Sequence, residues 1–115
     1  MTQSLIEIEK AAAILKLLGD KTRLTMIKLL DSNDCCVCEF VEMFQISQPA
    51  ISQHMRKLKD AGIVKEKRKG QWIFYSLIKD NEVYPLIQNI LQHLPNQDFN
   101  LKKLEEKGLR ISCCE

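Results

Sequence analysis

Three of the five cysteines lie close together, at Cys35, Cys36 and Cys38. Thiolates bind soft metal and metalloid ions, and a helix N-terminus favours the thiolate over the thiol. We expect a short helix to begin at these residues. A Cys-x-Cys pair inside a regular helix would point its side chains about 200° apart, so one ion could take both only by bending that turn. The alternative is that these small side chains simply pack in the interior.

The chain of 115 residues predicts a single domain over residues 1–115. No apolar run reaches the roughly 18 residues of a membrane span, and the N-terminus lacks the features of a signal peptide. We therefore expect a cytoplasmic protein with no membrane partner. In that reducing compartment, cysteines are more often thiols or metal ligands than structural disulfides, and their odd number agrees with this.

Positive charge is concentrated in one stretch of the chain. The whole chain has a net charge of +2, but residues 48–71 contain seven basic and two acidic side chains, giving +5. A clustered basic surface of this kind favours phosphate binding. A solvated basic face is the alternative interpretation.

The same stretch predicts a helix followed by a β-hairpin. Ser47 is a suitable N-cap, the helix covers about 48–61, and Gly62 closes it. Its outward residues could contact bases or phosphates in a DNA groove: Gln48, Ser52, Gln53, His54, Arg56 and Lys57. The hairpin covers about 63–77, with a basic tip of Lys67, Arg68 and Lys69. With a short helix predicted at 39–44, this order predicts a mainly α fold with a β-hairpin wing, a winged helix-turn-helix.

Two further helices are predicted near the ends of the chain, over about 5–18 and 81–94. The first has an apolar stripe of Leu5, Ile8, Ala12, Leu15 and Leu18, with Ser4 as its N-cap. The second has a stripe wider than one small core needs. Since helix-turn-helix proteins usually bind paired half-sites, we expect a homodimer formed through these helices. Burial within one chain is the alternative. A last charged helix is expected at 98–107.

Four segments also show a family pattern: LGDKTRLTMIKLL, CVCEF, SQPAISQHMRKLKDAGIV and KGQWIFYSL. Together they resemble the ArsR/SmtB family of metal-responsive repressors over about 15–77. The resemblance implies a homodimeric repressor that binds double-stranded operator DNA and releases it on capturing As(III) or Sb(III), with no organic cofactor.

The resemblance also implies the ligands. CVCEF is similar to the family's thiol box, which implies Cys36 and Cys38 as ligands. Val41 stands where the best-known members have a third cysteine, so another thiol is needed. Cys113 or Cys114 is expected to supply it, because Cys35 is constrained by its adjacent position. Some relatives sense through cysteines near a terminus, so the Cys113–Cys114 pair could instead dominate.

Other sites and functions are weighed against this one. The paired ligands of the family's zinc sensors are missing, since only His93 lies on the expected C-terminal dimer helix. A repressor that responds to thiol oxidation is the main alternative function. A thiol redox enzyme is a third, but the sequence shows no base near the cysteines and no phosphate-binding loop, so we expect no enzymatic activity.

Overall fold

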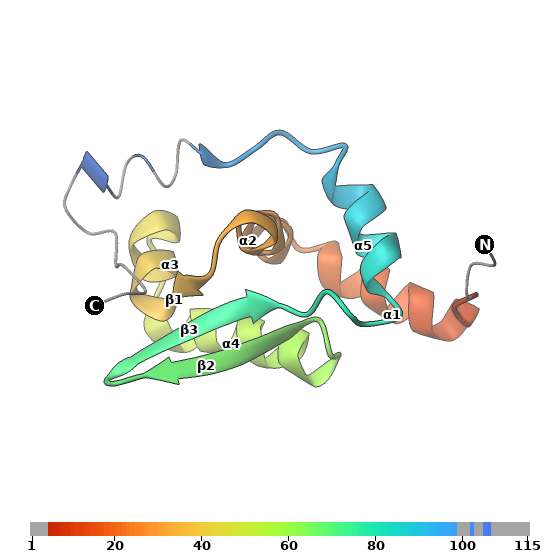
Figure 1. The fold of residues 1–115 in the computed structure, drawn as a ribbon, viewed down its shortest axis with the longest axis horizontal. Coiled ribbons are helices and arrows are strands. Elements are labelled where there is room, and N and C mark those ends of the chain that lie inside the picture. The colour runs from red at the N-terminus through yellow and green to blue at the C-terminus, as the bar shows by residue number, and fades with distance from the viewer. Residues whose placement is uncertain (1–4, 99–101, 103–104, 107–115) are drawn as a thin grey trace.

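The computed structural model describes residues 5–98, 102 and 105–106. Figure 1 shows the elements in chain order: α1 (Ile8–Leu18), α2 (Lys21–Ser32), β1 (Cys35–Cys36), α3 (Val37–Phe44), α4 (Gln48–Asp60), β2 (Val64–Lys69), β3 (Trp72–Leu77) and α5 (Tyr84–Leu91). The fold is mainly helical with one β-hairpin, as predicted. Within the described part of the chain, no helix has the length and apolar character needed to cross a membrane.

Local capping fixes where the central helices begin and end. The Asp20 side chain accepts a hydrogen bond from the Arg23 backbone N–H (3.0 Å) at the start of α2, and Ser47 accepts one from Ala50 (3.3 Å) at the start of α4. Both caps satisfy donors that lack a partner in the first helical turn. At the end of α4, Gly62 adopts φ +77°, a conformation that glycine reaches without a side-chain clash.

The wing is part of a three-stranded antiparallel sheet with the order β1-β3-β2. β2 and β3 form the predicted hairpin, and Gly70 at its tip adopts φ +60°. β1 was not predicted, because two residues are too short to show an alternating pattern. Its presence places the first two thiols of the cysteine cluster on the edge of the wing sheet.

The core lies between the helices and the inner face of this sheet. α4 contributes Ile51, Met55 and Leu58, all fully buried and spaced four and three residues apart on one face of the helix. Phe40 of α3 is also fully buried. The packing of α3 and α4 against this shared core holds the outward face of α4 at a fixed angle to the sheet.

The first helix begins later than predicted, and most of its apolar stripe is exposed. α1 begins at Ile8 with Glu7 as its N-cap, and the predicted cap Ser4 lies outside the described residues. Ile14 and Leu18 are buried, whereas Leu5, Ile8 and Leu15 are 95%, 83% and 49% exposed. Most of the predicted apolar stripe therefore faces away from the core of this chain.

The C-terminal helix is shorter than predicted. α5 spans Tyr84–Leu91 instead of about 81–94, with Pro85 in its first turn, where proline is tolerated. Asn81, just before this helix, connects its start to the end of α4. The Asn81 side chain accepts a hydrogen bond from Val83 N–H (2.8 Å) and donates one to the Gly62 carbonyl. Ile87 and Leu91 are buried. The helix expected at 98–107 lies largely outside the described residues.

Candidate functional site

Cys36 and Cys38 form a thiol pair at the start of α3. Their sulfur atoms are 3.1 Å apart, with the Cys38 thiol donating to Cys36 Sγ. The prediction that their side chains diverge was wrong because Cys36 is not inside the helix. It is the N-cap, with extended backbone angles of φ −85° and ψ 152°. The pair can therefore meet one ion without any bending of α3.

Glu39 holds this arrangement in place. Its side-chain Oε1 accepts a hydrogen bond from the Cys36 backbone N–H (2.8 Å), and Cys36 Sγ accepts one from the Glu39 backbone N–H. This is a capping box with cysteine in place of serine or threonine. Glu39 is 1% exposed, so its carboxylate is fixed inside the protein. The Cys-x-x-Glu spacing was the sequence signal that could have identified it.

The thiol pair holds its proton tightly. Cys38 is an exposed residue, but partial burial of its thiol raises the pKa of this group to about 12, and the hydrogen bond to Cys36 and the negative charges of Cys36 and Glu39 add to this effect. The expected preference for thiolate at the helix N-terminus is therefore wrong for Cys38. A negative charge on the neighbouring sulfur disfavours ionisation of Cys38. The pair retains a proton at neutral pH.

The other candidate ligands are Cys35 and the two C-terminal cysteines. Cys35 is fully buried in the hydrophobic core, and its Sγ lies 3.9 Å from the Asn33 carbonyl oxygen. Cys113 and Cys114 lie outside the described residues. Over residues 5–98, 102 and 105–106, no group of three His, Cys, Asp or Glu side chains is placed to hold a metal ion. The described residues thus bring together two of the expected sulfur ligands.

The sheet register connects the thiols to the wing. Residues directly opposite each other on antiparallel strands point to the same face. Cys36 is opposite Phe74, which is opposite Lys67, and these three make one row across the sheet. Lys69 completes this face, with its ammonium 5.8 Å from the centre of the Phe74 ring. The thiol pair and part of the basic wing therefore lie on one face of the same sheet.

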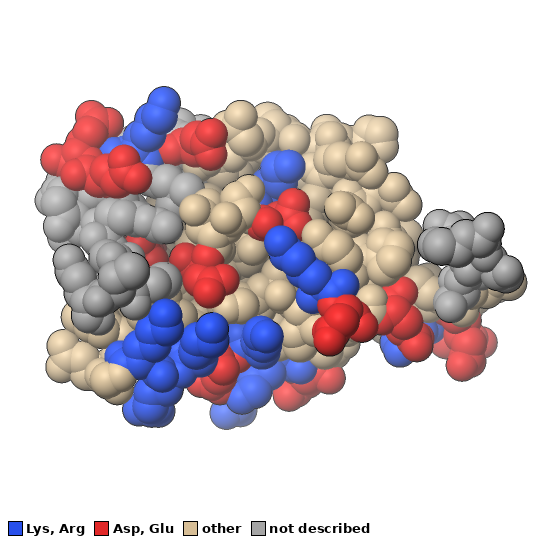
Figure 2. All heavy atoms as spheres, viewed as in Figure 1, with Lys and Arg blue, Asp and Glu red and all other residues tan. Residues whose placement is uncertain are grey.

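The expected DNA-binding face is exposed and basic. The described surface includes all of the polar α4 positions expected to contact DNA, and all but one of them are fully exposed: Gln48, Ser52, Gln53, Arg56 and Lys57, with His54 half-buried. Figure 2 shows Lys and Arg side chains gathered along the lower edge of the molecule, where α4, β2 and β3 lie. The wing-tip residues Lys67 and Arg68 are also exposed. Helix and wing thus present a mainly basic surface with a few acidic side chains among the basic ones.

His54 faces the protein on one side. Arg23 donates a hydrogen bond from its guanidinium to His54 Nδ1 (3.1 Å), and its Nε donates to the Leu17 carbonyl (2.7 Å). Burial lowers the pKa of His54; the Asp20 carboxylate opposes this effect, and the positive charges of Arg23 and Lys57 reinforce it. A neutral His54 is the form that accepts this bond. His54 therefore joins α4 to the end of α1 and the start of α2, a role that the sequence did not indicate.

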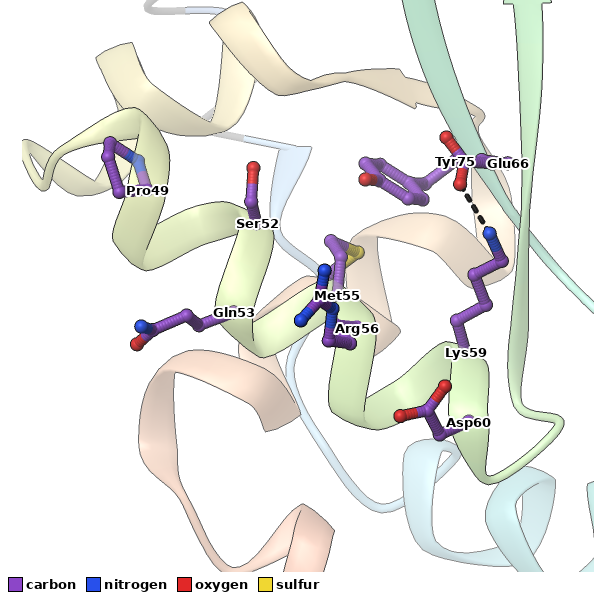
Figure 3. A pocket seen from close by; sticks show the side chains of 9 residues that line it. All are labelled: Pro49, Ser52, Gln53, Met55, Arg56, Lys59, Asp60, Glu66 and Tyr75. Carbon is purple, nitrogen blue, oxygen red and sulfur yellow. Dashed lines mark hydrogen bonds and ion pairs between the residues drawn. The ribbon is translucent and has the colours of Figure 1, made fainter.

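A groove of about 440 Å³ separates α4 from the wing. Figure 3 shows its lining, which comes from α4 (Pro49, Ser52, Gln53, Met55, Arg56, Lys59 and Asp60) and from the wing (Glu66 and Tyr75). Lys59 crosses the groove to an ion pair with Glu66, at 2.5 Å. The Glu66 carboxylate raises the pKa of Lys59. We call this feature the α4–wing groove.

Comparison with known proteins decides the family. Residues 20–66 match the family described as bacterial regulatory proteins of the arsR family. An HTH-type transcriptional regulator from Methanocaldococcus jannaschii is 44% identical over 85 residues, which are 71% of this chain and 96% of that protein. The chain belongs to the ArsR family.

Two further comparisons extend the likeness of this ArsR-family chain. The arsenic resistance transcriptional regulator ArsR1 of Pseudomonas putida is 42% identical over 107 residues, which are 92% of this chain and 80% of that protein. The structure of reduced HlyU from Vibrio cholerae matches with a TM-score of 0.63 and 33% identity, over 73% of this chain and 87% of that one. The predicted winged helix-turn-helix fold is confirmed.

Proposed function

We propose that this ArsR-family protein is a cytoplasmic homodimeric repressor that binds operator DNA and releases it on capturing As(III) or Sb(III). The ligands are Cys36, Cys38 and a third thiol from Cys113 or Cys114. The observation that supports this most directly is the 3.1 Å separation of the Cys36 and Cys38 sulfurs beside the wing sheet. The 42% identity to a regulator named for arsenic resistance supports the same ligand class.

The protons of the thiol pair favour a hydroxylated ion over a divalent cation. Arsenous acid is neutral at physiological pH and reacts as As(OH)3 + 3 RSH → As(SR)3 + 3 H2O. Each thiol proton leaves on a hydroxide of the acid, so no proton is released to solvent. A divalent cation must displace the protons into solvent instead, and the pKa of about 12 at Cys38 makes that costly at neutral pH.

The sheet offers a route from the thiols to DNA. Cys36 is both the N-cap of α3 and a residue of β1, so an ion that reorients its sulfur acts on both elements. β1 is paired to β3, and β3 to the basic strand β2. For release, the ion need only bind more tightly to the conformation that does not fit DNA. Movement of the wing relative to α4 meets that requirement.

The exposed apolar side chains of α1 and of Leu5 before it support dimerisation. The exposed side chains of Leu5, Ile8 and Leu15 are large and apolar, and a second copy would remove them from water. Two basic faces related by symmetry would contact two half-sites on one face of the duplex. A single small domain makes fewer phosphate contacts than a dimer, and its affinity for DNA is lower.

The test uses DNA selected from a random-sequence pool by the ion-free protein. Arsenite should abolish the gel shift of the wild type. Cys36→Ser/Cys38→Ser should bind DNA and keep it when arsenite is added. Cys35→Ser is the matched control, since Cys35 lies in the core, and it should release DNA normally. Normal release by Cys36→Ser/Cys38→Ser would refute the ligand assignment, and failure of the wild type to select DNA would refute the function.

Thiol oxidation is the second candidate function, favoured by the same short contact between sulfurs. Two thiols at 3.1 Å need to approach by only about 1 Å to reach disulfide bonding distance. The diamide reagent would take two electrons and two protons from the pair as the disulfide forms. Release of DNA by diamide that dithiothreitol reverses, with no response to arsenite, would establish this alternative.

Membership of a family of regulatory proteins supports a binding role over an enzymatic one.

A further inference from the structure

One acidic residue interrupts the basic strand of the wing. β2 contains Lys65, Lys67, Arg68 and Lys69, with Glu66 in their midst. A carboxylate on a DNA-binding strand repels phosphates, so its position requires a physical reason. The register supplies part of it: Glu66 is opposite Tyr75, so both point into the α4–wing groove.

In the groove, Glu66 occupies a place suited to an oxyanion. Its carboxylate is bound by the Lys59 ammonium, and the guanidinium of Arg56 and the hydroxyl of Tyr75 belong to the same lining. Figure 3 shows Lys59 reaching from α4 to Glu66, with Tyr75 beside the pair. The groove also runs between α4 and the wing, the two elements that carry the basic residues of the proposed DNA-binding surface. A backbone phosphate would present similar oxygens to the same donors.

We propose that the α4–wing groove is a binding site for a DNA backbone phosphate, and that Glu66 is a built-in competitor that holds Lys59 until DNA displaces it. This inference rests on the proposed DNA-binding function. Lys59 then contacts phosphate only in the complex, and Glu66 weakens binding to all DNA sequences alike. Such a competitor keeps the resting affinity for DNA low enough for an inducer to release it.

The exposure of the pair makes exchange possible. The Lys59 and Glu66 side chains are 50% and 38% exposed, so water already competes for both groups. Ion pairs of this kind contribute little to stability, so a phosphate can replace the carboxylate without disturbing the fold. Asp60 also lines the groove, so Glu66 is not the only acidic residue of its lining.

The test measures binding to a mixed-sequence duplex of about 30 base pairs, long enough for two half-sites one helical turn apart. Because phosphate contacts are independent of sequence, no operator is needed. Affinity is measured by fluorescence anisotropy between about 50 and 200 mM salt. The variants are Glu66→Gln, Lys59→Gln and the double variant. The matched control is Glu82→Gln, which breaks the exposed Lys10–Glu82 ion pair (2.7 Å) and removes the same charge outside the groove.

We expect Glu66→Gln to tighten binding about two- to thirty-fold for a dimer with two grooves, taking a typical exposed ion pair per groove. Lys59→Gln should weaken binding and reduce the salt slope by about 0.9 for each lost contact. In the Lys59→Gln background, the effect of Glu66→Gln should fall to that of Glu82→Gln. Unchanged melting temperatures show that the fold is intact.

Two results would overturn the inference while leaving the proposed function standing. One is a gain from Glu66→Gln no larger than that from Glu82→Gln. The other is the full gain persisting without Lys59, which would show that Glu66 acts only by general repulsion. By contrast, a wild type that binds no DNA at low salt would overturn the proposed function, and the inference with it.

Discussion

The exposed face of α1 allows a quantitative prediction about dimerisation. Replacing Ile8 and Leu15 with alanine removes three carbon atoms from each side chain, worth about 0.8 kcal/mol per carbon on complete burial. The two side chains are 83% and 49% exposed, so a partner that covers them gains about 2 and about 1 kcal/mol. Two protomers give about 6 kcal/mol, a loss of about four orders of magnitude in dimer affinity.

Sedimentation velocity over a range of concentrations measures this loss. Ile8→Ala/Leu15→Ala should be monomeric at concentrations where the wild type is a dimer. Its monomer should stay folded, because alanine favours helix and both side chains lie outside the core. Glu9→Ala/Lys16→Ala, exposed positions on the same helix, is the matched control and should remain dimeric. A double variant that dimerises within tenfold of the wild type would refute α1 as the interface.

Three more predictions follow from the site and the core. The affinity for arsenite should be nearly constant between about pH 6 and 8, while the affinity for Cd²⁺ rises with pH, because only the cation displaces thiol protons into solvent. Both affinities are measured by titration of the ultraviolet absorption of the sulfur–ion bond. An equal pH dependence of the two affinities would contradict this prediction. The pKa of His54 is lower in the folded chain than in the unfolded chain, so on acidification the unfolded chain binds a proton first. The contribution of the neutral His54 ring to the free energy of unfolding is therefore complete above about pH 6.5. This contribution is lost as the pH falls from there through the pKa of His54 in the folded chain. Urea unfolding at about pH 7.5 and 5.5 should therefore show a larger loss for the wild type than for His54→Gln, and equal losses would refute the linkage. Phe40→Ala, at a fully buried position, should lower the free energy of unfolding by about 3–5 kcal/mol, as measured by urea denaturation. A change below about 1 kcal/mol would show that the Phe40 side chain does not hold α3 against the core.

Local rules explain what could be predicted from the sequence. The start of α4 follows from Ser47 and Pro49, and its buried face from the spacing of apolar residues, because both depend on neighbours within one helix. The buried face of α1 could not be assigned this way. Its apolar residues surround more than one side, and only tertiary packing decides which side meets α2.

The thiol site shows the same division between local and long-range information. The residue types at Cys36 and Cys38 indicated soft-ion chemistry, but their mutual geometry depends on where the helix begins, a boundary that periodicity locates poorly. The pairing of β1 with β3 joins residues almost 40 positions apart and leaves no local pattern. The contact between His54 and Arg23 is likewise long-range, with 31 positions between them.

The short strand β1 explains how a small chemical event could change DNA affinity. It is tied to the sheet through only two residue pairs, Cys35 with Tyr75 and Cys36 with Phe74. Backbone hydrogen bonds contribute about 1 kcal/mol each, so releasing this ladder costs only a few kcal/mol per protomer. Reversing a two-state equilibrium from 1:99 to 99:1 takes about 5.5 kcal/mol, which two protomers and two captured ions can supply together. A longer strand would have more hydrogen bonds to β3, and ion binding could not separate it from the sheet. A thiol pair outside the sheet would have no connection through which to move the wing. An edge strand of two residues that includes the proposed ligand Cys36 meets both requirements.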